Sequence, residues 1–432
     1  MKTTRRGFVA KVGAALAMPY IITSKALGDG AVPPASERVT LALIGSGDRG
    51  AHQVMAWDFL PLPDVQFVAT CDPYKSKRED AARIVNEHYA AQAGAGSYRS
   101  CTPYRDFREM LEREDVDGAI IATPDGWHVP AALAAVRAGL DVYVEKPLGL
   151  TFEQDKLLRE TVRRYGAMFQ YGTQQRSMPH CRHGCEVVRS GRLGEIVSIE
   201  VVAPEGWAGG STEPIPVPED LDYDLWLGPA PYTPYTADRC SNRGAFFVYD
   251  NSIGFIAGWG SHPLDILDWA YGSDESVPVE FEGTGVIPTE GLFNAITTWD
   301  VSCRYANGVP LHFISGGGDL TKFTGTEGWI GISRGGDTAE PKSLLGTVIA
   351  PDKLQLPEST HHARNFVDGI KTRVFPVSTI ESAVRSDTIS QLGDIAIRTG
   401  RKIRWDPATE TIVGDDAGSR MLSRVPRAPY GY

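Results

Sequence analysis

The stretch "VTLALIGSGDRGAHQVMAWDF", residues 39–59, decides the fold of this chain. It opens with an apolar run that is typical of a buried strand, and a helical pattern follows the turn. Between them, Gly45, Gly47 and Gly50 complete the spacing G-x-G-x-x-G. In a strand–turn–helix unit, such glycines permit the tight turn, let the backbone approach a pyrophosphate and let helix and strand pack closely. The stretch therefore predicts the start of a dinucleotide-binding domain.

The next predicted strand ends in an acidic residue. This strand, "VQFVATCDP" over 65–73, places Asp72 about twenty residues beyond the last glycine, where a carboxylate can accept hydrogen bonds from an adenosine ribose. That position favours NAD as the cofactor. Lys75, Lys77 and Arg78 follow closely and could hold a 2′-phosphate, so NADP stays open as the alternative. Asp72 could also serve only as a turn or helix cap before the following proline.

Strand and helix patterns keep alternating after this point. The sequence predicts a helix over 76–89, a strand over 117–123, a helix over 130–138 and a strand over 141–147. This alternation predicts a doubly wound parallel sheet of the Rossmann type, whose ligands lie outside the carboxyl ends of the strands. The loops 123–128 and 145–147 are therefore candidate binding loops. The predicted cofactor contacts are Gly45, Gly47, Asp48, Arg49, Gly50, Asp72, Thr123, Pro124, Trp127, His128, Glu145 and Lys146.

Several of these motifs together give the chain a family resemblance. The tripeptide Glu145-Lys146-Pro147, the "ATP" at 122–124, the glycine turn and the acidic strand end resemble the Gfo/Idh/MocA family, after glucose-fructose oxidoreductase and inositol dehydrogenase. The resemblance implies a C-terminal α/β domain whose open, mostly antiparallel sheet forms the substrate floor and an oligomer face. A homodimer or homotetramer is therefore expected. It also implies a cis peptide before Pro147.

The resemblance extends from residue 37 to about residue 404 and suggests the domain organisation. The expected segments are a signal peptide and linker over 1–36, a Rossmann domain over 37–172, a C-terminal α/β domain over 173–359, a helix and strand packing back on the core over 360–404, and a tail over 405–432. At the end of the Rossmann domain, Thr151 and Gln154 form a capping box that predicts a helix to about Tyr165.

The resemblance points to Lys146 and His262 as the catalytic residues. Lys146 would touch a substrate hydroxyl near the nicotinamide and help to deprotonate it. Alternatively, it is a surface lysine paired with Glu145. His262 matches the histidine of the family's Asp-x-x-x-His helix, but Gly258 stands where the aspartate is usual, and Asp265 could substitute for it. The other interpretation of His262 is a core or helix-capping histidine.

Polar and aromatic residues of the second domain are candidate substrate contacts. Gln174 and Arg176 follow the strand predicted over 167–172, where family members present substrate-facing groups, although structural hydrogen bonds to the backbone are an equal alternative. Trp127 and Trp259 each lie near a motif histidine and are expected to form pocket walls. The predicted substrate contacts are Gln174, Arg176, Trp259 and Asp265.

Composition limits the partners and metals to be expected. The 432 residues carry a net charge of -11, which argues against nucleic acid as a partner. Six cysteines are too few for a disulfide scaffold, so free thiols are expected. The stretch "HCRHGC", residues 180–185, could bind a metal through its histidines and cysteines, but it reads as part of an amphipathic helix. We therefore expect no metal site.

The N-terminus carries a targeting pattern. Arg5 and Arg6 precede the apolar run 12–22, which is too short to span a membrane but suits a signal peptide cleaved near Ser24 or Ala26. The pattern resembles a twin-arginine (Tat) signal, so it implies recognition by the Tat machinery, export of the folded chain with its cofactor, a periplasmic or otherwise extracytoplasmic location and no permanent membrane anchor. An accidental basic pair is the alternative.

Three functions remain open. The leading hypothesis is an oxidoreductase that holds NAD tightly and transfers hydride to and from a sugar or glycoside. The second is an NAD-dependent glycoside hydrolase that oxidises a ring carbon transiently, eliminates the aglycone and returns the hydride. The third is a non-catalytic sugar-binding protein on a dehydrogenase scaffold.

Overall fold

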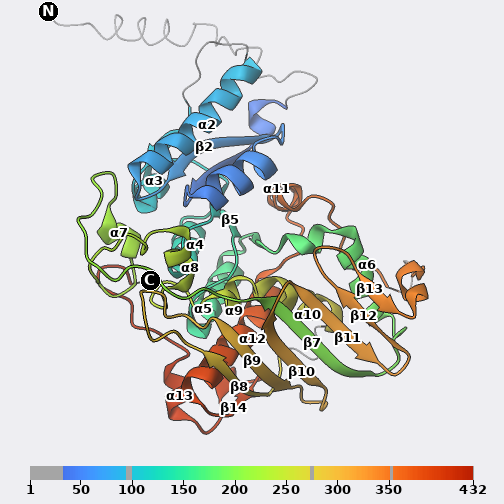
Figure 1. Cartoon of the computed structure of the whole chain (residues 1–432). Helices are drawn as coiled ribbons and strands as arrows, with labels where there is room; N and C mark the ends of the chain where they lie inside the picture. Colours follow the sequence, from blue (N-terminus) through green and yellow to red (C-terminus); the bar gives the residue numbers. More distant parts are fainter. Residues whose placement is uncertain (1–32, 94–99, 273–276, 351–353, 432) are drawn as a thin grey trace, which may run out of the picture.

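The structure is a computed structural model that describes residues 33–93, 100–272, 277–350 and 354–431 (Figure 1). The predicted signal with Arg5 and Arg6 lies outside these residues. Among the described helices, none is both long enough and apolar enough to span a membrane. Two α/β units carry the two sheets of the fold.

The N-terminal unit is built on a parallel sheet of six strands in the order β3-β2-β1-β4-β5-β6. Its strands are β1 Val39–Ile44, β2 Val65–Cys71, β3 Thr102–Tyr104, β4 Gly118–Ile121, β5 Asp141–Val144 and β6 Phe169–Tyr171. The order of the strands reverses between the adjacent strands β1 and β4. Doubly wound folds bind their ligands at this point. The predicted Rossmann sheet is confirmed.

Helices cover both faces of this sheet. They are η3 Asp48–Phe59, wound as a π-helix, α2 Lys75–Ala93, α3 Phe107–Arg113, α4 Asp125–Arg137 and α5 Phe152–Tyr165. α4 starts earlier than the predicted 130, since Asp125 takes its first position and Pro130 lies inside the helix. The predicted loop 123–128 is therefore partly helical.

The predicted capping box is only partly present. Thr151 is the N-cap of α5, but its hydroxyl makes no capping hydrogen bond. Gln154 instead accepts a hydrogen bond from the Leu150 N–H through Oε1, at 3.0 Å. The helix boundaries are as predicted, since α5 ends at Tyr165 and Gly166 follows in the left-handed conformation.

The second unit is a nine-stranded sheet in the order β13-β12-β11-β7-β10-β9-β8-β14-β15. Its strands are β7 Ile196–Pro204, β8 Glu280–Val286, β9 Thr298–Arg304, β10 Pro310–Gly316, β11 Leu320–Gly325, β12 Gly328–Ile332, β13 Thr338–Glu340, β14 Ile403–Asp406 and β15 Thr411–Ile412. Every pairing is antiparallel except that of β7 with β10. The open, mostly antiparallel sheet is confirmed.

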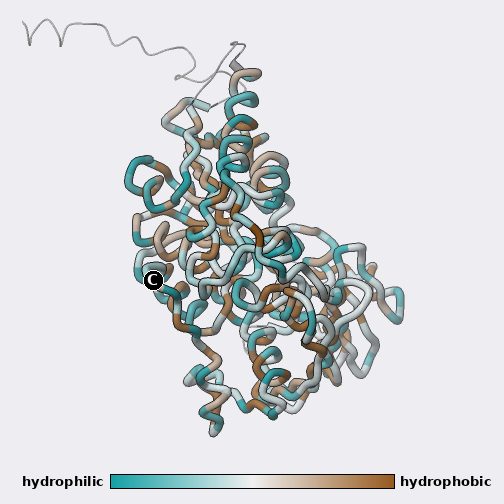
Figure 2. Tube along the Cα trace, turned by 60° about the vertical axis from the view of Figure 1, so that its left-hand side comes forward, coloured by the Kyte–Doolittle hydropathy of each residue, from teal (hydrophilic) through white to brown (hydrophobic). Residues whose placement is uncertain are grey.

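Helices pack on one face of this sheet (Figure 1). The principal ones are α6 Pro179–Arg189, α10 Ser261–Tyr271 and α12 Ile380–Thr399. On β9, side chains alternate, so Asp300, Ser302 and Arg304 are exposed on the other face. Figure 2 shows the hydrophobic stretches gathered inside the molecule, whereas the outer helices are largely hydrophilic.

The structure describes eight further helices. They are η2 Ala35–Glu37, η4 Gln174–Ser177, α7 Tyr223–Leu227, α8 Asn242–Phe247, α9 Phe255–Gly258, η5 Lys342–Gly346, α11 His362–Thr372 and α13 Asp416–Arg420. α11 packs on the Rossmann unit, where the Phe366 ring meets that of Phe59 edge-on at 6.2 Å.

The segment beyond residue 404 differs from the predicted tail. It completes β14, adds β15 to the sheet and forms α13. Farther on, Arg427 pairs with Asp224, and the buried Tyr430 ring packs against Trp127 with centres 5.5 Å apart. The apolar and aromatic residues of this segment, spaced among turn residues, supply the contacts that fold it onto the core.

Candidate active site

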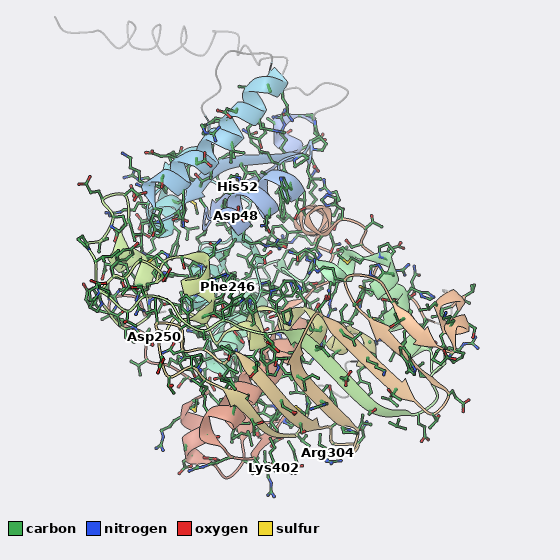
Figure 3. The ribbon with its side chains drawn as sticks, viewed as in Figure 1. Asp48, His52, Phe246, Asp250, Arg304 and Lys402 are labelled. Atoms are coloured by element: carbon green, nitrogen blue, oxygen red, sulfur yellow. The ribbon has the colours of Figure 1, made fainter. Side chains whose placement is uncertain are left out.

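A cavity of about 340 Å³ opens at the carboxyl ends of the Rossmann strands. All of the predicted cofactor contacts line it except Gly50. α8 and the residues before it supply the opposite wall, so that Asp48 and Phe246 come from facing sides in Figure 3. The second domain contributes Leu225, Trp226, Cys240, Ser241, Asn242, Ala245 and Phe246. The cavity therefore lies between the two units, with the glycine turn along one side.

The glycine turn has the geometry that the spacing predicts. Gly45 has a φ of +93°, and a Cβ there would lie 2.5 Å from the Ala122 carbonyl oxygen. A Cβ on Gly50 would lie 2.0 Å from the Gly45 carbonyl oxygen, so Gly50 serves the packing of helix against strand. A Cβ on Gly47 would meet no protein atom within 4 Å. Gly47 thus leaves an open backbone surface on the cavity, which suits the close approach of a pyrophosphate.

Asp72 lies at the end of β2 and holds the turn together. Its Oδ2 accepts from the Ser46 N–H at 2.9 Å, and its Oδ1 accepts from the Tyr74 N–H at 2.8 Å. Burial raises the pKa of this carboxyl, and the Lys77 charge and these backbone donors oppose that shift. Asp72 therefore caps the turn, as the alternative interpretation predicted. It also lines the cavity, where its remaining lone pairs can accept hydrogen bonds from a ribose.

Arg49 and Glu145 form an ion pair across the floor of the cavity. Arg49 Nη2 lies 2.8 Å from Glu145 Oε1, which also accepts from Gln174 Nε2 at 3.0 Å. The Arg49 guanidinium holds the pKa of Glu145 below its usual value against the opposing effect of burial, which is the largest single influence. The other carboxylate oxygen, Oε2, is buried without a hydrogen-bond partner among the described residues. Glu145 therefore keeps a free acceptor at the cavity.

Lys146 follows at the end of β5. Its Nζ donates to the Gly258 carbonyl oxygen at 2.8 Å, and it lies 5.7 Å from the centre of the Phe246 ring. Burial lowers the pKa of Lys146, while the Glu145 and Asp125 carboxylates raise it. The peptide before Pro147 is cis, as the resemblance implied. Lys146 contacts the second domain rather than pairing with Glu145 as a surface lysine would.

His262 lies in the first turn of α10 and is buried. Burial lowers the pKa of its imidazole well below the usual value, and the charges of Lys146 and Arg334 lower it further. Nδ1 is buried without a hydrogen-bond partner among the described residues. The Trp259 ring meets the imidazole edge-on with centres 5.6 Å apart, so Trp259 does flank His262. His262 is therefore a neutral proton acceptor at neutral pH.

Two residues of the segment 123–128 use their side-chain nitrogen atoms to bind other parts of the protein. His128 contacts the Pro147 carbonyl oxygen through Nδ1 at 2.6 Å and the Thr123 carbonyl oxygen through Nε2 at 2.8 Å. Trp127 Nε1 donates to the Leu225 carbonyl oxygen at 3.0 Å. His128 thus ties the two binding loops together, and Trp127 anchors the second domain. Both still line the cavity, so contact with a cofactor stays a prediction.

The predicted substrate contacts Arg176 and Asp265 require a correction. Arg176 and Asp265 form a buried bidentate ion pair with distances of 2.6 and 2.7 Å, and Arg176 also reaches Asp268 at 3.1 Å. The guanidinium is thus committed to protein acceptors, and Asp265 is not available to replace the missing aspartate beside His262. The pair fixes η4 to α10, which is a structural role.

The "HCRHGC" stretch does not act as one cluster. The buried Cys185 Sγ lies 4.0 Å from the Ile266 carbonyl oxygen, and His183 Nε2 lies 2.8 Å from the Thr347 carbonyl oxygen. Instead, donor atoms of His180, Cys181 and Asp337 lie within 4.8 Å of one another. A structural zinc site normally has four ligands, so we assign no metal to this group. All six cysteines are free thiols in the structure.

Sequence reasoning missed three residues near the site. Asp125 starts α4 on the cavity wall, and burial raises its pKa to about 7. Phe246 faces Lys146 from α8, and Arg334 lies close enough to act on the charges of Lys146 and His262. Asp125 lies in the candidate loop 123–128 without having been singled out, and no spacing pattern marks Phe246. The glycine-rich turn "SRGGD", which contains Arg334 and follows a strand, was the sequence feature that could have pointed to this residue.

The residues of the cavity fit a dinucleotide. The open surface at Gly47, the acid at Asp72 and the unpartnered Glu145 Oε2 and Thr123 Oγ1 offer places for a pyrophosphate, a ribose and polar groups of a nicotinamide. Lys146 lies on the cavity wall and supplies an N–H donor, and the neutral His262, which is not among the lining residues, lies within its electrostatic reach. The arrangement can therefore support proton transfer next to a bound dinucleotide.

Comparisons with known proteins agree with this geometry. Residues 39–173 match the family model described as "Oxidoreductase family, NAD-binding Rossmann fold", and residues 185–432 match "Oxidoreductase family, C-terminal alpha/beta domain". Among solved structures, an aldose-aldose oxidoreductase from Caulobacter crescentus is 18% identical with a TM-score of 0.60, covering 85% of this chain and 99% of that one. The WlbA dehydrogenase from Bordetella pertussis, in complex with NADH and UDP-GlcNAcA, is 17% identical with a TM-score of 0.59, covering 85% and 99%.

Curated relatives are similar over shorter segments. A glycosyl hydrolase family 109 protein of Saccharopolyspora erythraea is 39% identical over 120 residues, covering 28% of this chain and 25% of its own length. An alpha-N-acetylgalactosaminidase of Shewanella oneidensis is 31% identical over 176 residues, covering 39% and 35%. This chain thus matches well under half of the length of these relatives.

The two family models together account for nearly all of the described chain, and their order matches the order of the two sheets. The NAD-binding description applies to the unit that carries the glycine turn and the cavity. The chain belongs to the Gfo/Idh/MocA family of oxidoreductases, with an NAD-binding Rossmann domain and the family's C-terminal α/β domain.

Proposed function

We propose that this protein is an exported oxidoreductase that holds NAD tightly and transfers hydride to and from a carbon of a sugar or glycoside. The observation that carries the proposal is the position of Lys146, on the cavity wall at the carboxyl end of β5 and fixed to the second domain. His262 lies within the electrostatic reach of Lys146. NAD, when bound, supplies the hydride acceptor.

Lys146 and His262 have different roles in proton transfer. The Lys146 ammonium donates a hydrogen bond to the substrate hydroxyl oxygen and stabilises the negative charge that develops there as the C–H bond breaks. The neutral His262 imidazole accepts the hydroxyl proton, which its depressed pKa permits at neutral pH. The reverse reduction returns that proton from His262 to the alkoxide.

A direct experiment purifies the protein, releases its nucleotide by denaturation and measures turnover on a panel of sugars and glycosides. We expect NAD to co-purify and Lys146→Met to lower kcat by about 10²- to 10⁴-fold while NAD is retained. Loss of nucleotide binding in the unaltered protein would overturn the proposal. Turnover that survives Lys146→Met unchanged would favour a non-catalytic lysine, and the absence of any turnover would favour a sugar-binding protein.

A second candidate function is NAD-dependent glycoside hydrolysis. The names of the curated relatives favour it, and so does the presence of two separate proton-handling groups. After transient oxidation of a ring carbon, one group can remove the proton next to the new carbonyl while the other protonates the leaving aglycone. Release of aglycone without net NADH indicates this reaction, whereas accumulation of a keto-sugar with NADH indicates dehydrogenation.

Export and assembly are further parts of the proposal. The twin arginines Arg5 and Arg6 support Tat-dependent export to the periplasm or another extracytoplasmic space. The family resemblance supports a homo-oligomer, and the exposed face of the nine-stranded sheet, which includes Asp300 and Arg304, is the face that would join its copies. Cell fractionation of the Arg5→Lys/Arg6→Lys variant and light scattering of the purified protein test these two points. Unchanged export of the variant and a monomeric mass would contradict them.

A further inference from the structure

The loop between β12 and β13 brings an arginine beside the proposed catalytic pair. The Arg334 guanidinium carbon lies 5.9 Å from the centre of the Trp259 ring. That ring in turn meets the His262 imidazole edge-on at 5.6 Å. Besides burial, which is the largest cause, the Arg334 charge lowers the pKa of both Lys146 and His262. Arg334 therefore lies within electrostatic reach of both residues.

The Arg334 side chain is not neutralised by the protein. It takes part in no ion pair among the described residues, whereas Arg49 and Arg176 each bind a buried carboxylate. Its Nε is buried and has no hydrogen-bond acceptor in the described part of the chain. A buried, charged donor without an acceptor is unfavourable in the free protein. A bound oxyanion would supply the acceptor.

The loop that carries Arg334 is held in place by its neighbours. His180 Nε2 donates to the Ser333 carbonyl oxygen at 3.1 Å, and the Ser333 hydroxyl donates to the Gly336 carbonyl oxygen at 2.7 Å. The Arg334 N–H donates to Asp319 Oδ2 at 3.1 Å, and Gln175 donates to that same oxygen. The backbone of the turn is thus fixed before a ligand binds, which reduces the entropy lost on binding.

The acidic groups near the catalytic pair do not cancel this charge. Glu145 is paired with Arg49. Asp319 binds the Gln175 amide and the Arg334 backbone N–H, and its carboxylate forms no ion pair with the Arg334 guanidinium among the described residues. Burial raises the pKa of Asp125 to about 7, so this carboxyl is substantially protonated near neutral pH. Arg334 is also absent from the lining of the cavity that contains the glycine turn, so the pyrophosphate of NAD does not neutralise it by direct contact.

We infer that Arg334 forms a subsite for an anionic substituent of the substrate, so that the preferred sugar carries a carboxylate, sulfate or phosphate group. A guanidinium binds such oxyanions through two parallel N–H donors. Trp259 supports the arginine on one side and can contact an apolar face of the sugar ring. The inference rests on the proposed function, since it places the substrate beside Lys146 and His262.

The test measures the binding of sugars to the purified NAD-loaded protein by calorimetry. The probes are methyl glucoside, methyl glucuronide, glucose 6-phosphate and glucose 6-sulfate, together with the galacto isomers of each. We expect at least one acidic sugar to bind ten or more times tighter than its neutral counterpart. We expect Arg334→Met to bring the ratio of acidic-sugar affinity to neutral-sugar affinity to about one, and Arg334→Lys to retain part of the preference.

Lys322→Met is the matched control. It removes another cation that lies over a tryptophan, at 4.5 Å from the Trp329 ring centre, on β11. This variant should keep the full preference for the acidic sugar. Preference for a carboxylate, a sulfate or a phosphate identifies which oxyanion the subsite takes. Equal affinity for neutral and acidic sugars, or a preference that survives Arg334→Met, overturns the inference, while NAD retention and Lys146-dependent turnover report separately on the proposed function.

Discussion

The Lys146 ammonium donates a 2.8 Å hydrogen bond to the carbonyl oxygen of Gly258, at the position where the resemblance leads one to expect an aspartate. The carbonyl is free because the helix is interrupted there. α9 ends at Gly258, α10 begins at Ser261, and the His262 N–H bonds to the Trp259 carbonyl instead. A backbone acceptor thus fixes the lysine, and His262 receives no carboxylate from this position.

Restoring the family residue tests this arrangement. A Cβ on Gly258 would lie 3.5 Å from Phe255 and 3.8 Å from Phe246, which is ordinary contact, so Gly258→Asp should fold. The new carboxylate should raise the pKa of His262 and Lys146. Because His262 acts as a base in its neutral form, the acidic limb of kcat/KM should move to higher pH, by about one unit or more.

Gly258→Asn is the control for this experiment. It has nearly the same size as the aspartate variant but carries no charge, so its pH profile should match that of the unaltered protein. A pH–rate profile measured for all three proteins decides the point. Equal shifts in both variants would mean that the carboxylate does not act on His262.

The glycine turn permits a test that separates folding from cofactor binding. A Cβ at Gly47 meets no protein atom, so Gly47→Ala should leave the melting temperature of the NAD-free protein within about 2 °C. It should lower NAD affinity at least tenfold, because the Cβ projects where the backbone must approach the pyrophosphate. Calorimetric titration with NAD measures the loss.

Gly45→Ala should behave differently. Its φ of +93° and a contact of 2.5 Å with the Ala122 carbonyl oxygen predict destabilisation of the apoprotein by about 1–3 kcal/mol from the backbone conformation alone. Denaturant unfolding of both variants without NAD compares them. A Gly47 variant as unstable as the Gly45 variant would show that the turn needs both glycines for folding.

Much of this fold could be predicted from the sequence because its signals are local. The apolar run before Gly45 and the acid at Asp72 mark a strand–turn–helix unit within a few residues, and the structure has both. Asp125 lay within the candidate loop 123–128 but was not singled out, because a sequence does not show that it will be buried beside Ser252, 127 residues away. Arg176 was expected to face a substrate because a sequence does not show that Asp265, 89 residues away, will neutralise it.

The Arg176–Asp265 pair predicts a stability effect in place of a binding effect. Arg176→Met leaves Asp265 and Asp268 buried with fewer partners, and breaking such a pair typically costs about 3–5 kcal/mol. Urea unfolding of the variant measures this loss. If the variant keeps its stability but shows a raised KM for the substrate, the pair is not structural and the original expectation of a substrate contact returns.

The buried carboxyl of Asp125 predicts how stability depends on pH. Burial raises its pKa to about 7 in the folded protein, whereas an unfolded aspartate titrates near 3.9. Its contribution to stability is fully present below about pH 4 and is lost as the pH rises through about 7, because the unfolded state ionises first.

Asp125→Asn removes this titration. Between pH 4 and pH 8, the free energy of unfolding of the variant should therefore rise relative to that of the unaltered protein by up to about 4 kcal/mol. Urea unfolding of the NAD-free proteins at several pH values measures the difference. A constant difference across that range would show that Asp125 is already ionised in the folded state, in which case it would be a permanent counter-charge to Lys146.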